Sequence, residues 1–246
     1  MPAVSAIQIH PIKALDPVGV SEARMLASGA LEFDRQWALV DGRGRFVNGK
    51  NWAEVHRIRA AFDLGRREVA FDGRTFSIDR QGMDIALWFS ERLGEKIEWR
   101  EDVDMGFPDD TDSPGPTFVS EASLAAVAGW FGLPIDQTRR RFRANIEFDD
   151  AEPFWEDRLY GSSFQVGSVE FQAINPCARC VVPSRDPSMG EHIAGFQKQF
   201  TELRKAELPA WANAALFDHY YRFSVNTRAD QSQCGKLIRI GDELSF

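Results

Sequence analysis

Short strand-like stretches separated by turn residues fill the first hundred residues, and this pattern constrains the fold more than any other feature. Residues 69–71 and 75–78 each combine β-branched or aromatic side chains, and Asp72-Gly73 stands between them. Both turn residues tolerate positive φ, as a two-residue hairpin turn requires. The sequence therefore predicts a β-hairpin here. Similar stretches that predict further strands are residues 4–10, 18–25 and 37–40.

Helical periodicity is confined to a few segments. Residues 84–93 repeat apolar side chains at helical spacing, and Gly94 follows as a residue suited to end a helix. A second helix is expected between Ser120, whose hydroxyl can cap it, and Gly132. Residues 193–203 predict a third helix.

Strand patterns also occur in the second half of the chain. Residues 142–148 alternate apolar and polar side chains, which is typical of a half-buried strand. Residues 169–174 predict a strand that runs directly into a segment with two cysteines, and residues 223–225 and 237–240 predict two short strands. Many short strands and few helices occur without regular strand–helix alternation. We therefore predict a mainly β fold with some α structure (α+β), barrel-like rather than doubly wound.

One segment predicts a division into two domains. Residues 107–116, with the sequence FPDDTDSPGP, combine proline, glycine and acidic residues without an apolar period, as an exposed linker would. We expect an N-terminal domain at residues 1–106, a linker at residues 107–116 and a second domain at residues 117–246.

Composition excludes several classes of protein. The hydrophobic fraction of 43%, with 7 Trp and 19 Phe, suits a packed core. A net charge of −8 argues against general binding to nucleic acid or to anionic membranes. No segment approaches the roughly 20 apolar residues of a membrane span, and the N-terminus lacks the pattern of a secretory signal. Three cysteines are too few for a disulfide scaffold, so we expect a cytoplasmic protein.

Two of the three cysteines, Cys177 and Cys180, stand close together. Their spacing fits both thioredoxin-like redox pairs and zinc sites. A redox pair of that type needs flanking βαβ units, and a zinc site needs about four ligands, whereas only Cys234 and four unpaired histidines remain. An iron–sulfur cluster would likewise need four cysteines. A buried, inert cysteine is the plain alternative, but Arg179 between the two thiols argues against inertness for both.

The residues around the cysteines stand in a recognisable order. Pro176-Cys177-Ala178-Arg179-Cys180 is followed by Arg185-Asp186-Pro187 and Gly190, which resembles the signature of MOSC-domain molybdenum enzymes, such as the mitochondrial amidoxime-reducing component and its bacterial relatives. The resemblance implies an N-terminal β-barrel-like domain packed on a strand-rich MOSC β-barrel domain with short helices. Other segments similar to the family, in its order, are HPIK at 10–13, DRQWALV at 34–40, SEASL at 120–124, FRANI at 142–146, WED at 155–157, VG at 166–167 and IGD at 240–242.

The resemblance implies a molybdenum–molybdopterin cofactor, and no haem, flavin or iron–sulfur cluster in this chain. The resemblance also implies that Cys180 is the molybdenum ligand, a role that a soft thiolate suits. Cys177 is expected to be a neighbour that does not ligate. Lys13 and Arg35 match positions that contact the anionic end of the cofactor, and an ammonium and a guanidinium together suit a phosphate.

Five further residues are expected at this site. Arg143 and Asn145 stand two apart in the predicted strand, so both side chains would point into one pocket. Ser120 can cap its helix and contact the cofactor at the same time. Arg179 can contact the pterin or lower the pKa of the metal-binding thiol. Asp186 can orient a substrate, relay protons near the metal, or cap the helix that follows.

The activity implied by the resemblance is that of a molybdenum-dependent oxidoreductase. It would remove oxygen from N-hydroxylated or other N-oxygenated small molecules, using two electrons and two protons. Because the chain stops after the MOSC segment, we expect a separate electron-donor protein, similar to a ferredoxin or to a b-type cytochrome with a flavin reductase. An alternative is a non-catalytic MOSC module that binds the cofactor or carries sulfur on Cys180. A structural zinc protein or a simple thiol-redox protein is a weaker alternative, because the chain offers too few ligands.

Overall fold

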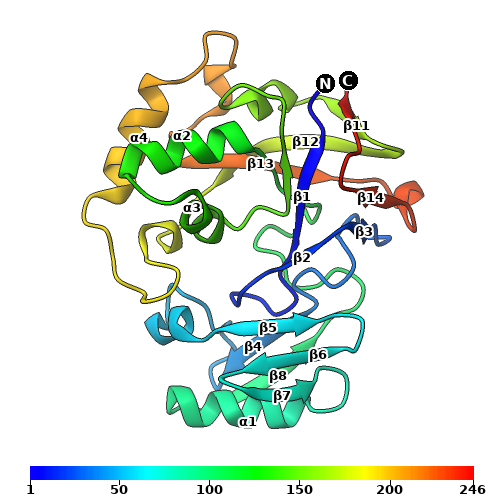
Figure 1. Cartoon of the computed structure of the whole chain (residues 1–246), viewed down its shortest axis with the longest axis vertical. Helices are drawn as coiled ribbons and strands as arrows, with labels where there is room; N and C mark the ends of the chain where they lie inside the picture. Colours follow the sequence, from blue (N-terminus) through cyan, green and yellow to red (C-terminus); the bar gives the residue numbers. More distant parts are fainter.

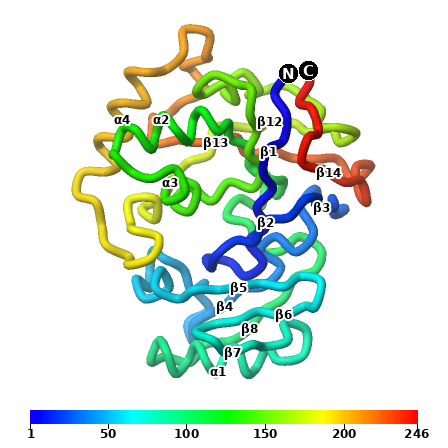
Figure 2. The backbone as a smooth tube through the Cα atoms, viewed as in Figure 1, coloured from blue at the N-terminus to red at the C-terminus, as the bar shows by residue number.

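Figures 1 and 2 show two lobes stacked along the long axis of the molecule, in a computed structural model that describes residues 1–246. Both chain termini lie together at the far end of the larger lobe (Figure 2). None of the helices is long and apolar enough to cross a membrane.

The larger lobe is built on an eight-stranded sheet, in which every neighbouring pair is antiparallel except β9 and β10. Three helices cover one side of this lobe (Figure 1). In spatial order the strands are β15 (Leu244–Ser245), β11 (Ser163–Val166), β12 (Val169–Ala178), β13 (Arg222–Arg228), β9 (Phe118–Ser120), β10 (Ile146–Phe148), β1 (Val4–Ile9) and β2 (Val18–Val20). The helices are α2 (Glu121–Phe131), α3 (Ile135–Phe142) and α4 (Phe196–Ala206).

The smaller lobe carries two small antiparallel sheets and one helix. A further two-stranded sheet joins the beginning and the end of the chain. The strands of the smaller lobe are β4 (Trp37–Asp41), β8 (Ile97–Glu101), β5 (Ala60–Asp63), β6 (Glu68–Phe71) and β7 (Arg74–Ser77), with helix α1 (Gly82–Leu93); the joining strands are β3 (Glu22–Arg24) and β14 (Leu237–Arg239). Short 3₁₀ helices are η1 (Ala53–Arg57), η2 (Trp155–Leu159), η3 (Val182–Ser184), η4 (Ala214–Leu216) and η5 (Gln231–Gln233).

The mainly β fold with α structure is confirmed, and several local predictions hold in detail. Asp72 and Gly73 adopt φ of 46° and 81° between β6 and β7, as the hairpin turn requires. Gly94 ends α1 in the left-handed conformation. The Ser120 hydroxyl caps α2 by accepting a hydrogen bond from the amide of Ser123.

Two strand predictions are wrong in part. Residues 142–145 are not a strand: Phe142 ends α3, and Arg143 follows in the left-handed conformation with φ 55°. Only β10 remains of the predicted strand, and α3 itself was not predicted. The expected strand at residues 18–25 is divided into β2 and β3, which belong to different sheets. The alternation of apolar and polar residues does not distinguish a helix end, or a strand divided in two, from one continuous strand.

The chain before residue 107 contributes to both lobes. Strand β1 pairs with β10 and β2 in the larger sheet, whereas β4 to β8 build the smaller lobe. The apolar core of the smaller lobe includes Trp37, Phe71 and Phe89, all fully buried. The division into domains at residues 107–116 stays a prediction, and in the structure this segment contains neither helix nor strand.

A buried polar cluster lies between η2, α2 and α4. Glu156 is 1% exposed; its Oε2 accepts a hydrogen bond of 2.9 Å from the Ser123 hydroxyl, and its Oε1 has no partner. Burial, and then the negative charge of Asp157, raise the pKa of Glu156 to about 7.

This raised pKa predicts a pH-dependent stability. Between the ordinary pKa near 4.5 and about 7, folded Glu156 holds a proton that the unfolded chain releases. Stability is therefore lost as pH rises through this window. Glu156→Gln, which stays neutral, should gain about 3 kcal/mol over the natural protein at pH 8 and almost nothing at pH 4. Urea unfolding of both proteins from pH 4 to pH 8 measures this difference, and parallel pH profiles would contradict the assignment.

Candidate functional site

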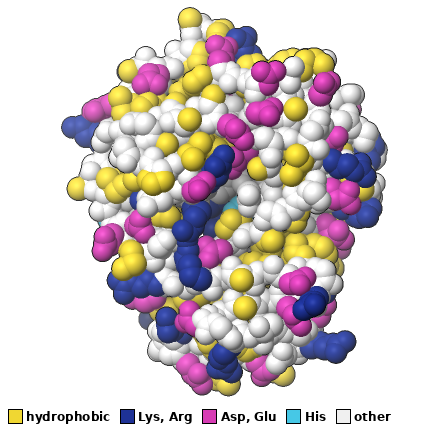
Figure 3. All heavy atoms as spheres, viewed as in Figure 1, with side chains coloured by type: hydrophobic (Ala, Val, Ile, Leu, Met, Phe, Trp, Pro, Cys, Tyr) yellow, Lys and Arg dark blue, Asp and Glu magenta, His cyan; other side chains and the backbone are white.

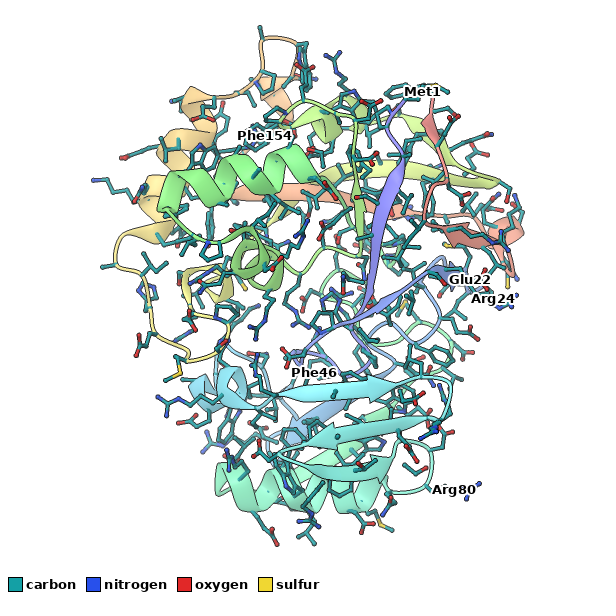
Figure 4. All side chains as sticks on the ribbon, viewed as in Figure 1. Met1, Glu22, Arg24, Phe46, Arg80 and Phe154 are labelled. Carbon is teal, nitrogen blue, oxygen red and sulfur yellow. The ribbon has the colours of Figure 1, made fainter.

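A cavity of about 430 Å³ lies where the two lobes meet, and segments from both lobes line it. Its volume is in the range of sites for small molecules and cofactors, roughly 300–1,000 Å³. Phe46, labelled in Figure 4, lies at this junction, and the ammonium of Lys13 is 5.3 Å from the centre of its ring.

Positive charge is concentrated in this cavity, although the whole chain carries −8. Ten Lys and Arg residues line it, against three Asp. Figure 3 shows Lys and Arg side chains gathered over the junction of the lobes. Such a cavity attracts anionic ligands. The basic residues are Lys13, Arg35, Lys50, Arg59, Arg140, Arg141, Arg143, Arg179, Arg185 and Arg222, and the acidic residues are Asp16, Asp109 and Asp110.

Both thiols of the cysteine segment line the cavity, are partly exposed and are free. Strand β12 carries Cys177 to the cavity, and the turn before η3 carries Cys180, whose sulfur accepts a hydrogen bond of 3.5 Å from the amide of Val182. Arg179 donates a hydrogen bond of 3.1 Å to the sulfur of Cys177. The guanidinium between the thiols therefore contacts Cys177 and not the expected ligand.

Lys13 and Arg35 also line the cavity. The Lys13 side chain is 8% exposed, and its ammonium donates to Asp109 Oδ1 at 2.7 Å and to the carbonyl of Phe107 at 2.8 Å. Burial lowers the pKa of Lys13, and Asp109 opposes this shift. Arg35 forms a close ion pair with Asp34. Two cations thus reach the cavity, each beside a carboxylate.

Asp34 also contacts His10, which is buried and does not line the cavity. Its Oδ1 accepts a hydrogen bond of 2.8 Å from the His10 amide. Burial, and then the charge of Arg143, lower the pKa of His10 to about 3, so the imidazole is neutral at physiological pH. Although burial raises the pKa of Asp34, Arg35 and His10 hold it below its usual range, so the carboxylate stays charged beside Arg35.

Arg143 and Asn145 line the same cavity, although both lie before β10 and not in a strand as expected. Arg143 has a buried Nη2 without a hydrogen-bond partner. Burial, and then Arg35, lower its pKa to about 10, which leaves it charged at neutral pH. Asn145 donates to the carbonyl of Gln8 at 3.1 Å and accepts from the amide of Thr117 at 3.2 Å. Its amide therefore joins β1 to the segment before β9.

Ser120 and Asp186 lie outside the cavity lining. Ser120 is fully buried, and its hydroxyl contacts that of Ser123 at 2.7 Å. Asp186 accepts two hydrogen bonds of 2.8 Å from the amides of Ser188 and Met189. It thus caps a turn and not helix α4, which begins after Gly195.

Several lining residues were not predicted. Arg140 and Arg141 project from α3, and Arg141, 3% exposed, donates to the carbonyl of Pro183 at 3.0 Å. The run of three arginines at 139–141 is the sequence feature that could have indicated these basic lining residues. Asp109 lies in the expected linker, where its composition suggested only an exposed loop.

The fold and the cavity define a two-lobed, strand-rich protein with a cavity rich in basic residues that also carries two thiols. Two family models match the chain: the MOSC N-terminal beta barrel domain over residues 1–84, and the MOSC domain over residues 117–245. The chain belongs to the MOSC family, as its motifs indicated. It therefore contains the MOSC N-terminal β-barrel domain and belongs to a family related to the molybdenum cofactor.

Curated relatives are distant. A "Molybdenum cofactor sulfurase" of Drosophila willistoni is 24% identical over 242 residues, which cover 84% of this chain and 30% of the relative. A "Mitochondrial amidoxime-reducing component 1" of Danio rerio is 24% identical over 231 residues, which cover 76% of this chain and 70% of the relative. The chain thus spans about a third of the length of the sulfurases. A crystal structure of the YUAD protein from Bacillus subtilis matches all of this chain and 97% of that one with a TM-score of 0.44 and 10% identity.

Proposed function

We propose that this protein binds the molybdenum cofactor in the cavity between its lobes and reduces N-oxygenated small molecules. The observation that carries this proposal is the partly exposed thiol of Cys180 in a cavity lined by ten cations, in a chain of the MOSC family. Similarity to an amidoxime-reducing protein supports the substrate class. A separate protein would donate the electrons, and the cytoplasm is the proposed location.

The donor atoms of the cavity fit such a cofactor. Arg143 Nη2, Arg179 Nε and Arg185 Nε are buried and lack hydrogen-bond partners. A buried donor without an acceptor costs about 1–3 kcal/mol, so a ligand rich in acceptors would be stabilised here. A phosphate and the carbonyl and ring nitrogen atoms of a pterin are acceptors of this kind.

Each residue has a proposed part in binding. Lys13, Arg35 and Arg143 would hold the anionic end of the cofactor, since they are cations that reach one cavity. Cys180 would offer a soft thiolate to the metal. Arg179 would face the pterin, and Asn145 keeps the wall in place through its bonds to Gln8 and Thr117. When bound, the cofactor would supply two-electron redox chemistry at molybdenum.

Ser120 and Asp186 would act indirectly. Ser120 caps α2 behind the wall. Asp186 shapes the turn at residues 186–189 and lies 3.7 Å from the Arg141 guanidinium, which lines the cavity. We propose that Asp186 orients this arginine toward a substrate.

A second candidate is a module that binds the cofactor, or carries sulfur on Cys180, without catalysis. The similarity to cofactor sulfurases favours it. The partly exposed thiol of Cys180 suits a sulfur carrier as well as a metal ligand, since both roles need an accessible thiolate.

Metal and pterin content test the proposal directly. Protein purified from cells able to make the cofactor should contain molybdenum and yield the fluorescence of oxidised pterin. Zinc alone, or neither metal nor pterin, would contradict cofactor binding. The dithionite-reduced protein should then convert a model N-hydroxyamidine to the amidine, and a loaded but inactive protein would favour the carrier.

A further inference from the structure

Residues 106–116 form a segment, here called the strap, that contributes to the cavity lining and is held at both ends. At the first end Gly106 has φ 69°, and a Cβ there would lie 2.7 Å from the carbonyl oxygen of Asp34. At the other end the Gly115 amide donates to the carbonyl of Thr227 at 3.1 Å, and the Thr227 hydroxyl donates to the carbonyl of Pro116 at 2.6 Å. Close backbone approach therefore anchors both ends.

The middle of the strap lines the cavity without forming a helix or strand. Its carbonyl at Asp112 accepts a hydrogen bond of 2.9 Å from Arg228, and the Asp110 carboxylate accepts one of 3.0 Å from the amide of Asp112. Its one ion pair with the cavity wall is that of Asp109 with Lys13. The backbone of the strap is also held near this point, because the Phe107 carbonyl accepts a hydrogen bond of 2.8 Å from Lys13 and the Phe107 ring lies 5.5 Å from that of Phe46. The Asp109 side chain can therefore turn away from Lys13 once this pair is broken, while the backbone of the strap stays in place.

The two partners of this ion pair are buried to very different extents. The Lys13 side chain is 8% exposed and the Asp109 side chain 79%. A buried ammonium needs an acceptor, because an unpaired buried charge is costly. The Asp109 carboxylate is already largely hydrated and loses little when it leaves. Lys13 thus needs an anionic partner, and another anion could take the place of the Asp109 carboxylate.

Asp109 is charged at physiological pH. The surrounding cavity walls partly desolvate this carboxyl and raise its pKa, but the positive charges of Lys13 and Arg35 hold the pKa below the usual range. A carboxylate therefore occupies the place where the proposed function puts an anionic ligand.

We propose that Asp109 is an internal counter-ion that competes with anionic ligands for Lys13, and that the Asp109 side chain turns aside when such a ligand binds. This proposal rests on the proposed function in one respect: it takes Lys13 as a residue that binds the anionic end of the cofactor. The Asp109 carboxylate would lower the affinity of the cavity for small free anions. A ligand with many contacts would still displace it.

Inorganic phosphate, titrated by calorimetry into the full chain purified from cells that cannot make the cofactor, tests the competition. Asp109→Asn keeps the shape and removes the charge, so it should bind phosphate about tenfold more tightly than the natural protein. Asp112→Asn is the matched control: it makes the same charge change at an exposed strap residue outside the cavity lining, and its affinity should stay within about twofold. Lys13→Gln added to Asp109→Asn should abolish the gain.

Equal or weaker phosphate binding by Asp109→Asn would overturn the proposal, since Asp109 would then support Lys13 rather than compete for it. An equal gain in phosphate affinity from Asp112→Asn would also overturn the proposal, because the gain would then come from the lower net negative charge and not from the loss of a competitor at Lys13. Thermal unfolding without phosphate checks that each variant is folded. If Asp109→Asn fails to fold, Asp109→Ser takes its place, with the same expected gain in phosphate affinity. The two proposals can fail separately. If Asp109→Asn binds phosphate more tightly but the protein never acquires pterin in cells that make the cofactor, the competition is supported and the proposed function is rejected.

Discussion

Cys180→Ser protein is expected to lose both molybdenum and pterin, whereas Cys177→Ser protein keeps them. Serine offers a hard oxygen that stays protonated, and it cannot replace a soft thiolate on this metal. Loss of an outer partner of a metal site typically costs about 10–100-fold in affinity or activity, so loss of the ligand should cost more than about a hundredfold. Metal analysis per chain, together with pterin fluorescence, measures both variants.

The two cysteines make a matched pair for this experiment. Both line the same cavity, both are partly exposed, and both substitutions change one sulfur to oxygen. They differ in their contacts: Arg179 binds the sulfur of Cys177, whereas Cys180 accepts only a long bond from the Val182 amide. Equal losses in both variants, or loss only in Cys177→Ser, would refute Cys180 as the ligand.

Arg204→Met is expected to lower the free energy of unfolding by about 3–5 kcal/mol. Arg204 and Asp157 form a close ion pair in which the side chains are only 2% and 1% exposed. The Arg204 guanidinium also lies 4.0 Å from the ring centre of Phe154, which Figure 4 labels beside α2. Removing the arginine leaves a buried carboxylate without its cation. Urea unfolding at pH 7 measures the loss.

A double variant separates the charge effect from lost packing. Asp157→Asn in the Arg204→Met background removes the unpaired charge, so it should recover more than half of the lost stability. No recovery would show that packing of Arg204 on Phe154, and not the buried charge, dominates. Since neither residue lines the cavity, molybdenum content per folded chain should stay unchanged in both variants.

Signals confined to a few neighbouring residues predicted their structures correctly. The Asp72-Gly73 hairpin, the Ser120 cap and the end of α1 at Gly94 all depend on backbone angles and hydrogen bonds within four residues. Such interactions are present in the sequence itself and need little help from the rest of the fold.

The error at residues 142–145 has a physical explanation. Apolar and polar residues alternate there, but Phe142 is buried as the last residue of α3, beside Phe196 and Phe200. Arg143 then turns the chain in the left-handed conformation. Packing of a helix end against a distant helix overrode the local pattern, which no alternation rule detects.

The sequence alone determined the strand-rich class, the MOSC family and the thiol expected to hold a metal, because these depend on residue types in a fixed order. The tertiary structure decided which charges meet. Lys13 and Asp109 pair across 96 residues, and Arg179 contacts one cysteine rather than the other. Ser120 and Asp186 lie outside the cavity lining, although they stand in matching motifs. Contacts between side chains far apart in the chain depend on the path of the backbone and on burial, and a linear pattern does not encode either.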